Sequence, residues 1–359
     1  MIKAAGHWFL KSGIQEGLGG VARFYRSDLG QNAPVSTEIT GYAASALFFL
    51  HQRTGESAYL DAGTRAARFL AHTAWDRHLG IFPFELIANG STGLAYFFDC
   101  GIIVRGLLSA WRTTEDREFR DAAIAGGRAM LADFPRPGAS CSVIHPILAL
   151  PEKRPLDWGT RWSNGPGCYQ LKSALAWREL FDVTGESVFL NAYESTLEAA
   201  LANDPDFLPG AQERLQVMDR LHAYSYFLEG LLPVLDRPEC AAAVRNGLDR
   251  AGGYLREIAP LFARSDVYAQ VLRVRLFADA HGAVPLNQTA AQHEAESAAS
   301  FQLRSDQLPG HAGGFLFGRK NGHDLPYVNP VSTAFCLQAL ALWQDRQAGR
   351  RLPSPQTLI

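Results

Sequence analysis

"ITGYAASALFFLHQRTGESAYLDAGTRAARFL" (residues 39–70) contains two helical patterns of opposite character. The first half, residues 39–50, carries no charged side chain, which is typical of a helix that is buried on most of its faces. The second half carries aspartate and arginine at regular spacing, so that helix should expose one face to water. Gly55 between the halves suits the left-handed position that ends a helix. The stretch therefore predicts a hairpin made of one inner and one outer helix.

The same hairpin pattern recurs along the chain. The outer half "RTGESAYLDAGTRAARFL" (53–70) returns as "VTGESVFLNAYESTLEAAL" (183–201) and, more weakly, as "RTTEDREFRDAAIAGGRAML" (112–131). Such periodic similarity is typical of folds that repeat one helical unit. The predicted inner helices span residues 37–53, 98–112, 167–182, 221–235, 265–279 and 331–347, and the predicted outer helices span residues 57–73, 115–133, 187–202, 238–257 and 288–302.

The two ends of the chain also repeat one another. "PVST" stands at 34–37 and again at 330–333, each time after a Gly-Gly loop. Both copies are predicted to begin an inner helix, with the proline before a serine or threonine cap. No outer helix follows the last inner helix, where residues 349–359 read as a tail. We therefore expect an N-terminal helix at about residues 2–13 to pack outside the last inner helix and close a ring.

These elements predict an all-α fold, the (α/α)6 toroid, in which six inner and six outer helices form a closed ring. The prediction covers residues 1–359 as a single domain, with short β-hairpins in the loops at one pole. In its repeats, its Gly-Gly hairpin before "STEITGY" and its helix "LHAYSYFLEGLL" (221–232), the chain resembles the six-hairpin glycosidase-like group and the sugar epimerases and uronate-processing enzymes built on the same ring. The resemblance lies in architecture and covers nearly the whole chain.

Composition excludes several classes of protein. A net charge of −2 offers no basic surface for nucleic acid, and no apolar run approaches the roughly 18 residues of a membrane span. The start of the chain reads as an amphipathic helix rather than a signal peptide. The five cysteines have no CxxC spacing, which favours buried free thiols in a reducing compartment, and we expect a cytoplasmic protein. The cysteines are Cys100, Cys141, Cys168, Cys240 and Cys336.

Motifs that would point to other toroid enzymes are absent from the sequence. It contains no DDxxD or DxDD cluster, no helical His-x-x-x-His pair and no P-loop. We therefore expect no metal and no cofactor. The resemblance implies that the working cavity lies at the N-terminal ends of the inner helices, where free N–H groups favour anions and hydroxyls.

Aromatic and polar residues are concentrated at those expected helix starts and in the long loop between residues 135 and 166. Aromatic rings stack on sugar faces, and Asp, Asn, Arg and His pair with hydroxyls, so the partner we expect is a glycan or sugar substrate. The predicted substrate-binding residues are Arg23, Tyr42, Asp157, Trp158, Arg161, Trp162, Asn164, Tyr169, Tyr224, Tyr268, Arg319 and Tyr327. Tyr226, Asp266, His311, Asn329 and, more weakly, Glu85 are further candidates. Each of these residues also has a structural alternative, as a packing, turn or first-turn residue.

Glu38 and Asp99 are the predicted catalytic pair, because each lies in the first turn of an inner helix in successive hairpins. Packed helix axes lie about 8–10 Å apart, the scale of two carboxyl groups that flank a sugar. The apolar run before Asp99 should raise its pKa, while the hydroxyl groups around Glu38 should hold that residue ionised. We predict Asp99 as proton donor and Glu38 as base, with His222 as the alternative base.

Two classes of function remain open. The first is an enzyme that acts on an oligosaccharide or a uronic-acid-containing polysaccharide by hydrolase, lyase or epimerase chemistry. The second is a non-catalytic toroid that binds a glycan or a protein during polysaccharide assembly. The enzyme hypothesis requires at least one carboxyl group with a raised pKa, whereas the binding hypothesis requires only aromatic and arginine side chains.

Overall fold

The structure is a computed structural model that describes residues 1–86, 93–135, 144–156 and 162–359. Within this part of the chain the fold is predominantly helical, with twelve α-helices and only short strands. The described residues form two compact units. Unit 1 comprises Met1–Ile14, Phe24–Ala33 and Asp204–Ile359, and unit 2 comprises Gln15–Arg23 and Pro34–Asn203.

Unit 2 contains the first three inner helices and the outer helix that follows each of them. Its helices are α2 (Thr37–Thr54), α3 (Ser57–Arg68), α4 (Phe97–Thr114), α5 (Arg117–Asp133), α6 (Leu171–Thr184) and α7 (Ser187–Phe207), whose last residues belong to unit 1. The inner helices pack closely, since a Cβ atom on Gly106 of α4 would lie 2.7 Å from the carbonyl oxygen of Gly41 in α2. This close packing of α2 on α4 places the first turns of the two helices next to one another.

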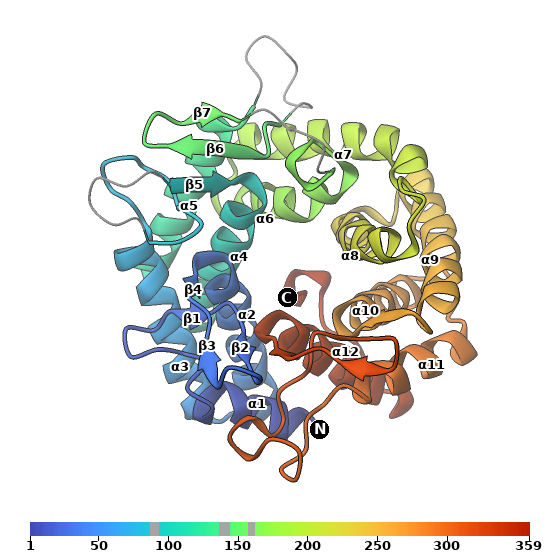
Figure 1. Ribbon diagram of the computed structural model, residues 1–359. Helices are drawn as coiled ribbons and strands as arrows, with labels where there is room; N and C mark the ends of the chain where they lie inside the picture. The colour runs from blue at the N-terminus through green and yellow to red at the C-terminus, as the bar shows by residue number, and fades with distance from the viewer. Residues whose placement is uncertain (87–92, 136–143, 157–161) are drawn as a thin grey trace. The chain divides into compact units, whose positions relative to one another are not determined.

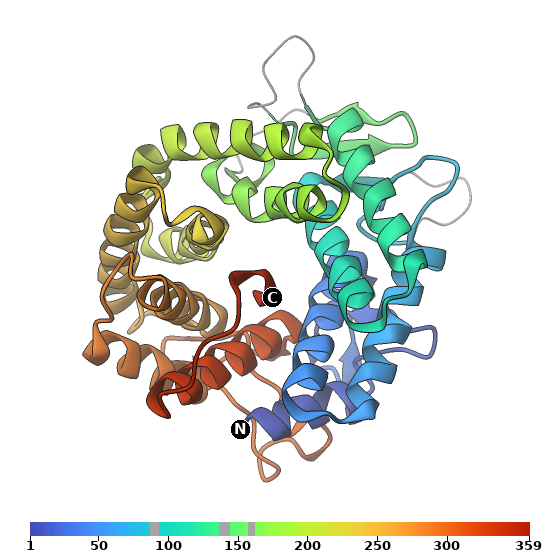
Figure 2. The same ribbon diagram turned by 180° about the vertical axis from the view of Figure 1, so that it is seen from behind.

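Unit 1 contains the other three inner helices and their outer partners. Its helices are α1 (Ile2–Lys11), α8 (Arg214–Gly230), α9 (Pro238–Ile258), α10 (Ser265–Ala280), α11 (Gln288–Ala299) and α12 (Pro330–Gln347). Inner helix α10 contacts α8 on one side and α12 on the other. Helix α1 packs against α12, as both ribbon views show (Figures 1 and 2).

Short antiparallel strands stand directly before four of the inner helices. In unit 2, β1 (Val21–Ala22) pairs with β4 (Val35–Ser36) before α2, and β5 (Gly93–Tyr96), β6 (Ile147–Leu150) and β7 (Arg154–Pro155) form a sheet before α4. In unit 1, β8 (Phe262–Arg264), β9 (Gly318–Lys320) and β10 (His323–Asp324) form a sheet before α10, and β2 (Tyr25–Arg26), β3 (Gln31–Asn32) and β11 (Tyr327–Val328) form a sheet before α12. The predicted β-hairpins in the loops are confirmed.

Most helix boundaries lie close to the sequence prediction, but α3 ends at Arg68 instead of 73, α6 begins at Leu171 instead of 167, and α7 ends at Phe207 instead of 202. The fourth hairpin differs most. The inner helix expected at 221–235 begins at Arg214 and ends at Gly230, before the 3₁₀ helix η4 (Leu232–Val234). Pro233 has no N–H group, so it cannot continue the α-helical hydrogen bonds. The remaining short turns are the π-helix η1 (Phe69–Ala74) and the 3₁₀ helices η2 (Trp162–Asn164), η3 (Cys168–Gln170), η5 (Pro309–His311) and η6 (Pro355–Thr357).

The two PVST copies occupy different places in their helices. Ser36, in the first copy, is the cap of α2, and its side chain accepts a hydrogen bond from the Ile39 N–H. The cap of α12 is Asn329, one residue before the second copy, and Pro330 is already helical. The prediction that both prolines precede a Ser or Thr cap is therefore wrong for the second copy. The reason is that the side-chain Oδ1 atom of Asn329 accepts from two N–H groups, those of Val331 and Ser332.

The Gly-Gly loops at the two ends of the chain make equivalent contacts. Gly19 and Gly313 both have positive φ, +101° and +93°. A side chain on Gly19 would collide with the carbonyl oxygen of Arg65 in α3, and one on Gly313 would collide with that of Ala4 in α1. Helix α1 therefore contacts the last hairpin as α3 contacts the first.

The next glycine of each loop repeats the relation one helical turn further on. A Cβ atom on Gly20 would lie 2.9 Å from the ring of Phe69, four residues after Arg65. A Cβ atom on Gly314 would lie 2.7 Å from the indole nitrogen of Trp8, four residues after Ala4. These matching contacts confirm that the N-terminal helix serves as the sixth outer helix.

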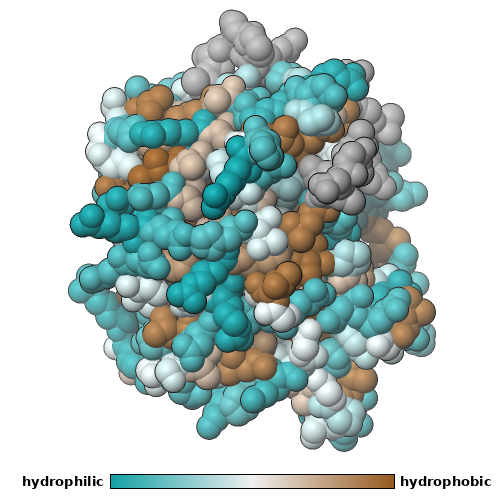
Figure 3. Space-filling view, turned by 90° about the vertical axis from the view of Figure 1, so that its left-hand side faces the viewer, coloured by the Kyte–Doolittle hydropathy of each residue, from teal (hydrophilic) through white to brown (hydrophobic). Residues whose placement is uncertain are grey.

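Burial follows the predicted inner and outer patterns. In α12, all residues from 330 to 343 are buried, whereas α3 exposes its charged residues Asp61, Arg65 and Arg68. On the face drawn in Figure 3, hydrophilic residues cover much of the surface, with hydrophobic residues in separate patches between them. None of the described helices is long and apolar enough to cross a membrane.

The predicted tail, residues 349–359, is anchored at its far end. Leu358 and Ile359 are buried, and the buried side chain of Gln338 in α12 bonds to this segment. The Gln338 amide donates to the Thr357 carbonyl at 2.7 Å, and the Ile359 N–H donates to the Gln338 carbonyl at 3.1 Å. The end of this segment is therefore part of the packed core of unit 1.

Candidate active site

Glu38 and Asp99 lie in the first turns of the neighbouring inner helices α2 and α4, as predicted. Asp99 is buried, with 6% of its surface exposed, and Glu38 is half-buried. The Oδ2 atom of Asp99 has no hydrogen-bond partner among the described residues. A buried carboxyl oxygen without a partner is unusual, since buried polar atoms are nearly always hydrogen-bonded.

Both carboxyl groups have raised pKa values. Burial raises the pKa of Glu38 to about 7, against the opposing effect of the Arg23 charge. Burial also raises the pKa of Asp99 well above its usual range, and the negative charge of Glu38 raises it further, again opposed by Arg23. Because the charge of each group affects the other, the pair titrates as a unit, and Asp99 is the last to lose its proton.

The hydroxyl groups around Glu38 do not have the role predicted for them. Thr37 donates to the carbonyl of Pro83 at 2.7 Å, and Thr40 donates to the carbonyl of Ser36 at 2.7 Å. Ser36 in turn accepts from a backbone N–H. These hydroxyl groups satisfy the backbone, so the expectation that they hold Glu38 ionised is wrong. Arg23 is the group that favours the ionised form.

Arg23 is held beside the acid pair by an aromatic ring and a carboxylate. Its guanidinium lies 4.5 Å from the centre of the Phe84 ring, and it forms an ion pair with Glu85. Its Nε atom is buried and has no hydrogen-bond partner in the part of the chain that the structure describes. The weaker sequence candidate, Glu85, is therefore the carboxylate that pairs with Arg23, and one N–H of the guanidinium is still available.

A second charged cluster lies at the start of α10 in unit 1. Arg264 donates to both oxygens of Asp266, at 3.0 and 2.7 Å, and also pairs with Asp219 at 3.0 Å. The Nδ1 atom of His222 lies 2.9 Å from the Gln270 carbonyl oxygen and 3.3 Å from the nearer Asp266 oxygen. Two acceptors around Nδ1 favour the tautomer with the proton on that atom, which leaves Nε2 as an acceptor.

The titration behaviour of this cluster is opposite to that of the acid pair. Burial alone would raise the pKa of Asp266, but Arg264 and His222 together hold it below its usual range. Burial, aided by the charge of Arg264, lowers the pKa of His222 to about 4, although Asp266 and Gln270 oppose the shift. At neutral pH this cluster therefore contains an ionised aspartate and a neutral histidine.

Helical spacing determines which tyrosines lie near His222 and Asp266. Tyr226, one turn after His222, places its ring 4.6 Å from the imidazole. Tyr224 points instead toward the outer helices, where its hydroxyl donates to Asp204 at 2.6 Å. Tyr268, two residues after Asp266, likewise contacts His293 of outer helix α11. Of these tyrosines, Tyr226 is the one that the structure brings to His222.

Several other predicted binding residues have structural contacts. Tyr42 is buried in α2, with 1% of its surface exposed. Tyr169 donates to the carbonyl groups of Ser163 and Gly165 and so anchors the turn before it. Half-buried Asn164 belongs to the 3₁₀ helix η2 in that same turn.

The remaining candidates in unit 1 belong to the short sheets and loops. Arg319 pairs with Asp324 across the β9–β10 turn, and Tyr327 lies in β11 with its ring 5.1 Å from that of Phe24. His311 is stacked on Tyr25, with ring centres 3.6 Å apart. Asp157, Trp158 and Arg161 lie outside the described residues, as does the side chain of Trp162.

Two site residues were missed by the sequence analysis, Arg264 and Gln270. Gln270 stands four residues after Asp266, so the helical period places both on one face of α10. Arg264 stands two residues before Asp266, at the end of β8. The four-residue spacing from Asp266 could have predicted Gln270 as a site residue. The bidentate pairing of Arg264 could not be predicted, because it depends on the strand that precedes the helix.

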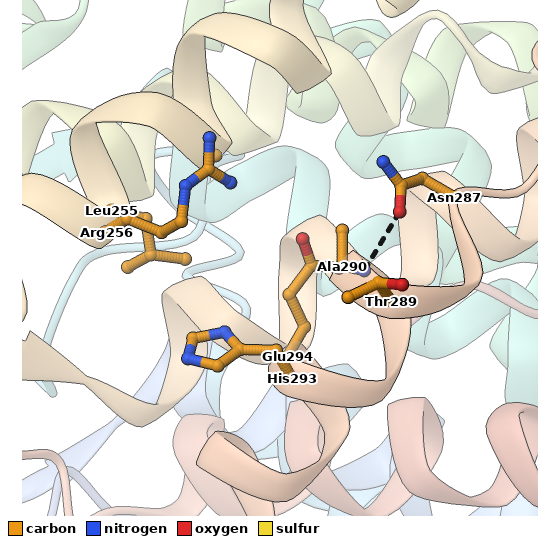
Figure 4. Close-up of a pocket in the computed structure, with 8 residues that line it drawn as sticks. Leu255, Arg256, Asn287, Thr289, Ala290, His293 and Glu294 are labelled. Carbon is orange, nitrogen blue, oxygen red and sulfur yellow. Dashed lines mark hydrogen bonds between the residues drawn. The ribbon is translucent and has the colours of Figure 1, made fainter.

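A separate pocket of about 400 Å³ lies between the outer helices α9 and α11 (Figure 4). Arg256 approaches it from α9 and His293 from α11, while Glu294 in its wall is paired with Arg275 at 2.8 Å. None of the residues predicted for the sugar site lines this pocket. In the part of the chain that the structure describes, no three His, Cys, Asp or Glu side chains form a potential metal site.

Solved structures identify the fold. The chain is similar to a sugar epimerase from a ruminal bacterium, with a TM-score of 0.70 and 11% identity over 95% of this chain and 98% of that one. It is similar to an unsaturated glucuronyl hydrolase specific for heparin, with a TM-score of 0.69 and 11% identity over 98% of both chains. It is also similar to the cellobiose 2-epimerase of Spirochaeta thermophila, with a TM-score of 0.69 and 14% identity over 95% of this chain and 94% of that one.

No protein-family model and no curated protein sequence matches the chain. The structural similarity extends over nearly the whole chain, and it confirms the predicted α/α toroid fold. At these identities the similarity concerns the fold. The chemistry of this chain has to be argued from its own residues.

Proposed function

We propose that this chain is a carbohydrate-active enzyme that acts on an oligosaccharide or a uronic-acid-containing polysaccharide by acid–base chemistry. The observation that carries the proposal is the pair of carboxyl groups with raised pKa values, Glu38 and Asp99, on adjacent inner helices. Strongly shifted titratable groups concentrate at active sites. A raised carboxyl pKa is also the feature that separates the enzyme hypothesis from the binding hypothesis. The names of the structural neighbours, epimerases and a glucuronyl hydrolase, support the same class.

In the proposed mechanism the active form of the pair holds one proton. Asp99 keeps it, because burial and the charge of Glu38 both oppose its ionisation. Protonated Asp99 donates this proton to the substrate, and ionised Glu38 removes a proton from a water molecule or a sugar carbon. The pair then still holds one proton, which returns from Glu38 to Asp99 before the next turnover. His222 is the alternative base.

Arg23 is proposed to bind a substrate carboxylate. Its unpartnered Nε atom and its Nη2 atom, which now contacts Glu85, lie along one edge of the guanidinium. That edge matches a carboxylate in two-point geometry. A uronate bound there would displace Glu85 and lie close enough to the acid pair for its charge to be felt by both groups.

The test is Asp99→Asn, assayed with the substrate found by screening a library of neutral and uronate-containing oligosaccharides. The variant should lose about 10²–10⁴-fold in turnover while its melting temperature stays near that of the wild type. Asp61→Asn, on the exposed face of α3, is the matched control and should keep full activity. Retention of more than about a tenth of the rate by Asp99→Asn would refute the proposed role.

Product masses then assign the reaction. Hydrolysis adds one water per bond broken, lyase chemistry adds none and leaves an unsaturated product, and epimerisation leaves the mass unchanged. A glycan that binds but is not converted, with affinity lost in Arg23→Ala and kept in Asp99→Asn, would favour the alternative of a non-catalytic glycan-binding toroid.

We further propose a reducing, cytoplasmic location for the protein. Cys100, Cys168, Cys240 and Cys336 are buried free thiols, which fits a compartment that keeps thiols reduced, and Cys141 lies outside the described residues. Thiol labelling of the unfolded protein, isolated under alkylating conditions from its native cells, should modify all five cysteines. Recovery of a disulfide would contradict the proposal.

A further inference from the structure

Helix α1 is joined to the last hairpin of unit 1 by a hydrogen bond between two buried side chains. The Nε1 atom of Trp8 donates to the Nδ1 atom of His311, in the 3₁₀ helix η5, at 3.2 Å. Trp8 is 1% exposed and His311 is 7% exposed. The bond therefore connects the two ends of the chain inside the protein, where water cannot replace either partner.

The direction of this bond fixes the state of the imidazole. An indole N–H group can only donate, so Nδ1 of His311 must be the unprotonated nitrogen of the ring. The proton of the neutral ring is then on Nε2. Protonation of Nδ1 would place two N–H groups against one another and leave the buried indole N–H of Trp8 without its acceptor. A charged His311 therefore cannot accept the bond that a neutral His311 accepts.

The stacked ring of Tyr25, in β2, has the opposite effect on the imidazole. The two ring centres are 3.6 Å apart, and the ring planes are 21° from parallel. A tyrosine face attracts a cation, so this contact alone would favour the protonated form. Burial nevertheless lowers the pKa of His311. The cost of burying the charge is therefore the larger effect, and the neutral form is the one that this environment stabilises.

Charged side chains on the elements around His311 are exposed or paired with one another. Arg26, the neighbour of Tyr25 in β2, pairs with Asp28 at 2.6 Å. The groups that face the imidazole are the Trp8 indole and the Tyr25 phenol. The exposed ionisable residues of α1 and of the loop before η5 are Lys3, His7, Lys11, Arg304 and Asp306.

The contacts around this bond also connect α1 with the sheet that stands before α12. A Cβ atom on Gly314 would lie 2.6 Å from a methyl carbon of Val328, in β11, and 2.7 Å from the Trp8 indole nitrogen. Val328 is in turn paired with Tyr25 across the β2–β11 ladder. Departure of α1 from His311 would therefore remove packing from this sheet as well as from the face of α12.

We propose that Trp8 and His311 form an acid-sensitive latch, which holds α1 on the last hairpin while the imidazole is neutral and releases α1 when it is protonated. This latch is independent of the proposed catalytic activity. In the released state the histidine has its ordinary pKa of about 6.5. The latched state has a lower pKa, so it binds the proton less readily than the released state. The latch is thus fully present above about pH 6.5 and is weakened as the pH falls toward the lowered value.

Hydrogen exchange of the intact chain, followed by mass spectrometry, measures the release of α1. Protection factors of the α1 amides, corrected for intrinsic exchange and compared with those of α10, should fall by about three- to tenfold between pH 8 and pH 5.5. The upper value applies if His311 stays neutral in the latched state throughout this range. A fall of less than about twofold would overturn the proposal.

A variant and a matched control assign the effect to His311. His311→Asn keeps an accepting oxygen near the position of Nδ1 and cannot be protonated there, so its α1 protection should not fall between pH 8 and pH 5.5. His7→Asn, on the exposed side of α1, should keep the fall seen in the wild type. The same fall in His311→Asn as in the wild type would overturn the latch.

A spectroscopic measurement on the wild type does not depend on how His311→Asn folds. In protein labelled with ¹⁵N-tryptophan, the Trp8 indole signal is the one that disappears in Trp8→Phe. This signal should shift as the pH falls below about 6.5, because its acceptor is being protonated. An indole signal that stays constant between pH 8 and pH 4 while α1 protection falls would show that another group controls α1, and would overturn the proposal.

Discussion

Asp99 in unit 2 and Asp266 in unit 1 are both buried aspartates in the first turn of an inner helix, but they differ in their hydrogen-bond partners. Asp266 receives two hydrogen bonds from Arg264 and one from the Val267 N–H. Asp99 has an oxygen without a partner among the described residues. The charge of Arg23, which opposes the rise in the Asp99 pKa, also acts on Glu38 and is paired with Glu85.

Position at a helix start therefore does not set the protonation state of these aspartates. Both aspartates experience the same favourable end of a helix dipole, an effect of about 0.3–1 kcal/mol. Burial acts in the same direction on both. The bidentate guanidinium of Arg264 reverses the effect of burial for Asp266, and no such partner reverses it for Asp99. The Asp266 cluster is therefore suited to hold an ionised carboxylate, and the surroundings of Asp99 are suited to hold a protonated one.

The largest expected effect is on stability, in Arg264→Gln. The change would leave Asp266 buried without its guanidinium, which typically costs about 3–5 kcal/mol of unfolding free energy. The same change at Arg23 should cost no more than about 1 kcal/mol, because its partner Glu85 is on the surface. Urea unfolding of both variants at pH 7 measures the difference. Equal losses would remove the distinction between the clusters.

The pH dependence of stability provides the next test, in Glu38→Gln. A carboxyl group whose folded pKa is raised stabilises the fold below its unfolded pKa, and this stability is lost as pH rises from about 4.5 to about 7. The glutamine variant does not lose this stability as the pH rises. Between acid pH and pH 8, its unfolding free energy should therefore rise relative to that of the wild type by at most about 3 kcal/mol.

Asp266→Asn should show the opposite sign. The folded pKa of Asp266 is lowered, so its contribution is present above its unfolded pKa and is lost as pH falls. The asparagine variant should therefore be less stable than the wild type at pH 7, with the deficit shrinking toward acid pH. Melting curves check the two signs, from about pH 4 to pH 8 for Glu38→Gln and below about pH 5 for Asp266→Asn, where its stabilisation is lost. Slopes of the same sign would contradict the assignment.

The pKa of His222 provides a further test of the Asp266 cluster, with a smaller expected effect. Its imidazole should stay neutral until the pH falls to about 4. In Arg264→Gln its pKa should rise, because the guanidinium charge that disfavours imidazolium is gone. NMR titration of the histidine side chains measures both values. A His222 that titrates near pH 6.5 in the wild type would show that burial does not control it.

The smallest expected effect is on substrate affinity, in Glu85→Gln. Exposed ion pairs contribute about 0.2–1 kcal/mol, so release of Arg23 from Glu85 should lower KM for a uronate substrate by up to about fivefold. KM for a neutral oligosaccharide should not change. A uniform change for both substrates would mean that Arg23 does not contact the carboxylate.

The toroid hairpins were predictable because they rest on local patterns, such as the uncharged run at 39–50 and the Gly55 stop. The register of PVST in the last hairpin was not, because it depends on the side chain of Asn329 outside the repeat. The environment of Glu38 depends on the carbonyl groups of Pro83 and Phe84, which are more than 40 residues away along the chain.

Some features of the candidate site were likewise predictable from the sequence, and others were not. The pairing of Glu38 with Asp99 was predictable from equivalent positions in successive hairpins, and the raised pKa of Asp99 follows from its apolar neighbours. Tyr226, rather than Tyr224, could have been chosen from the helical period alone. The contact of His222 in α8 with Gln270 in α10 joins two separate helices, which no local pattern indicates.

The contact of α1 with the last hairpin has a consequence for biosynthesis. Ala4 emerges from the ribosome about 300 residues before Gly313, the glycine that packs on it. At about 5–20 residues per second, translation separates the two by roughly 15–60 s. During that interval unit 2 can assemble, while the apolar face around Trp8 has no native partner. Ribosome-bound chains stalled before residue 313 should therefore show protected amides in α2 and α4 and unprotected ones in α1, which makes this helix the segment most in need of a chaperone.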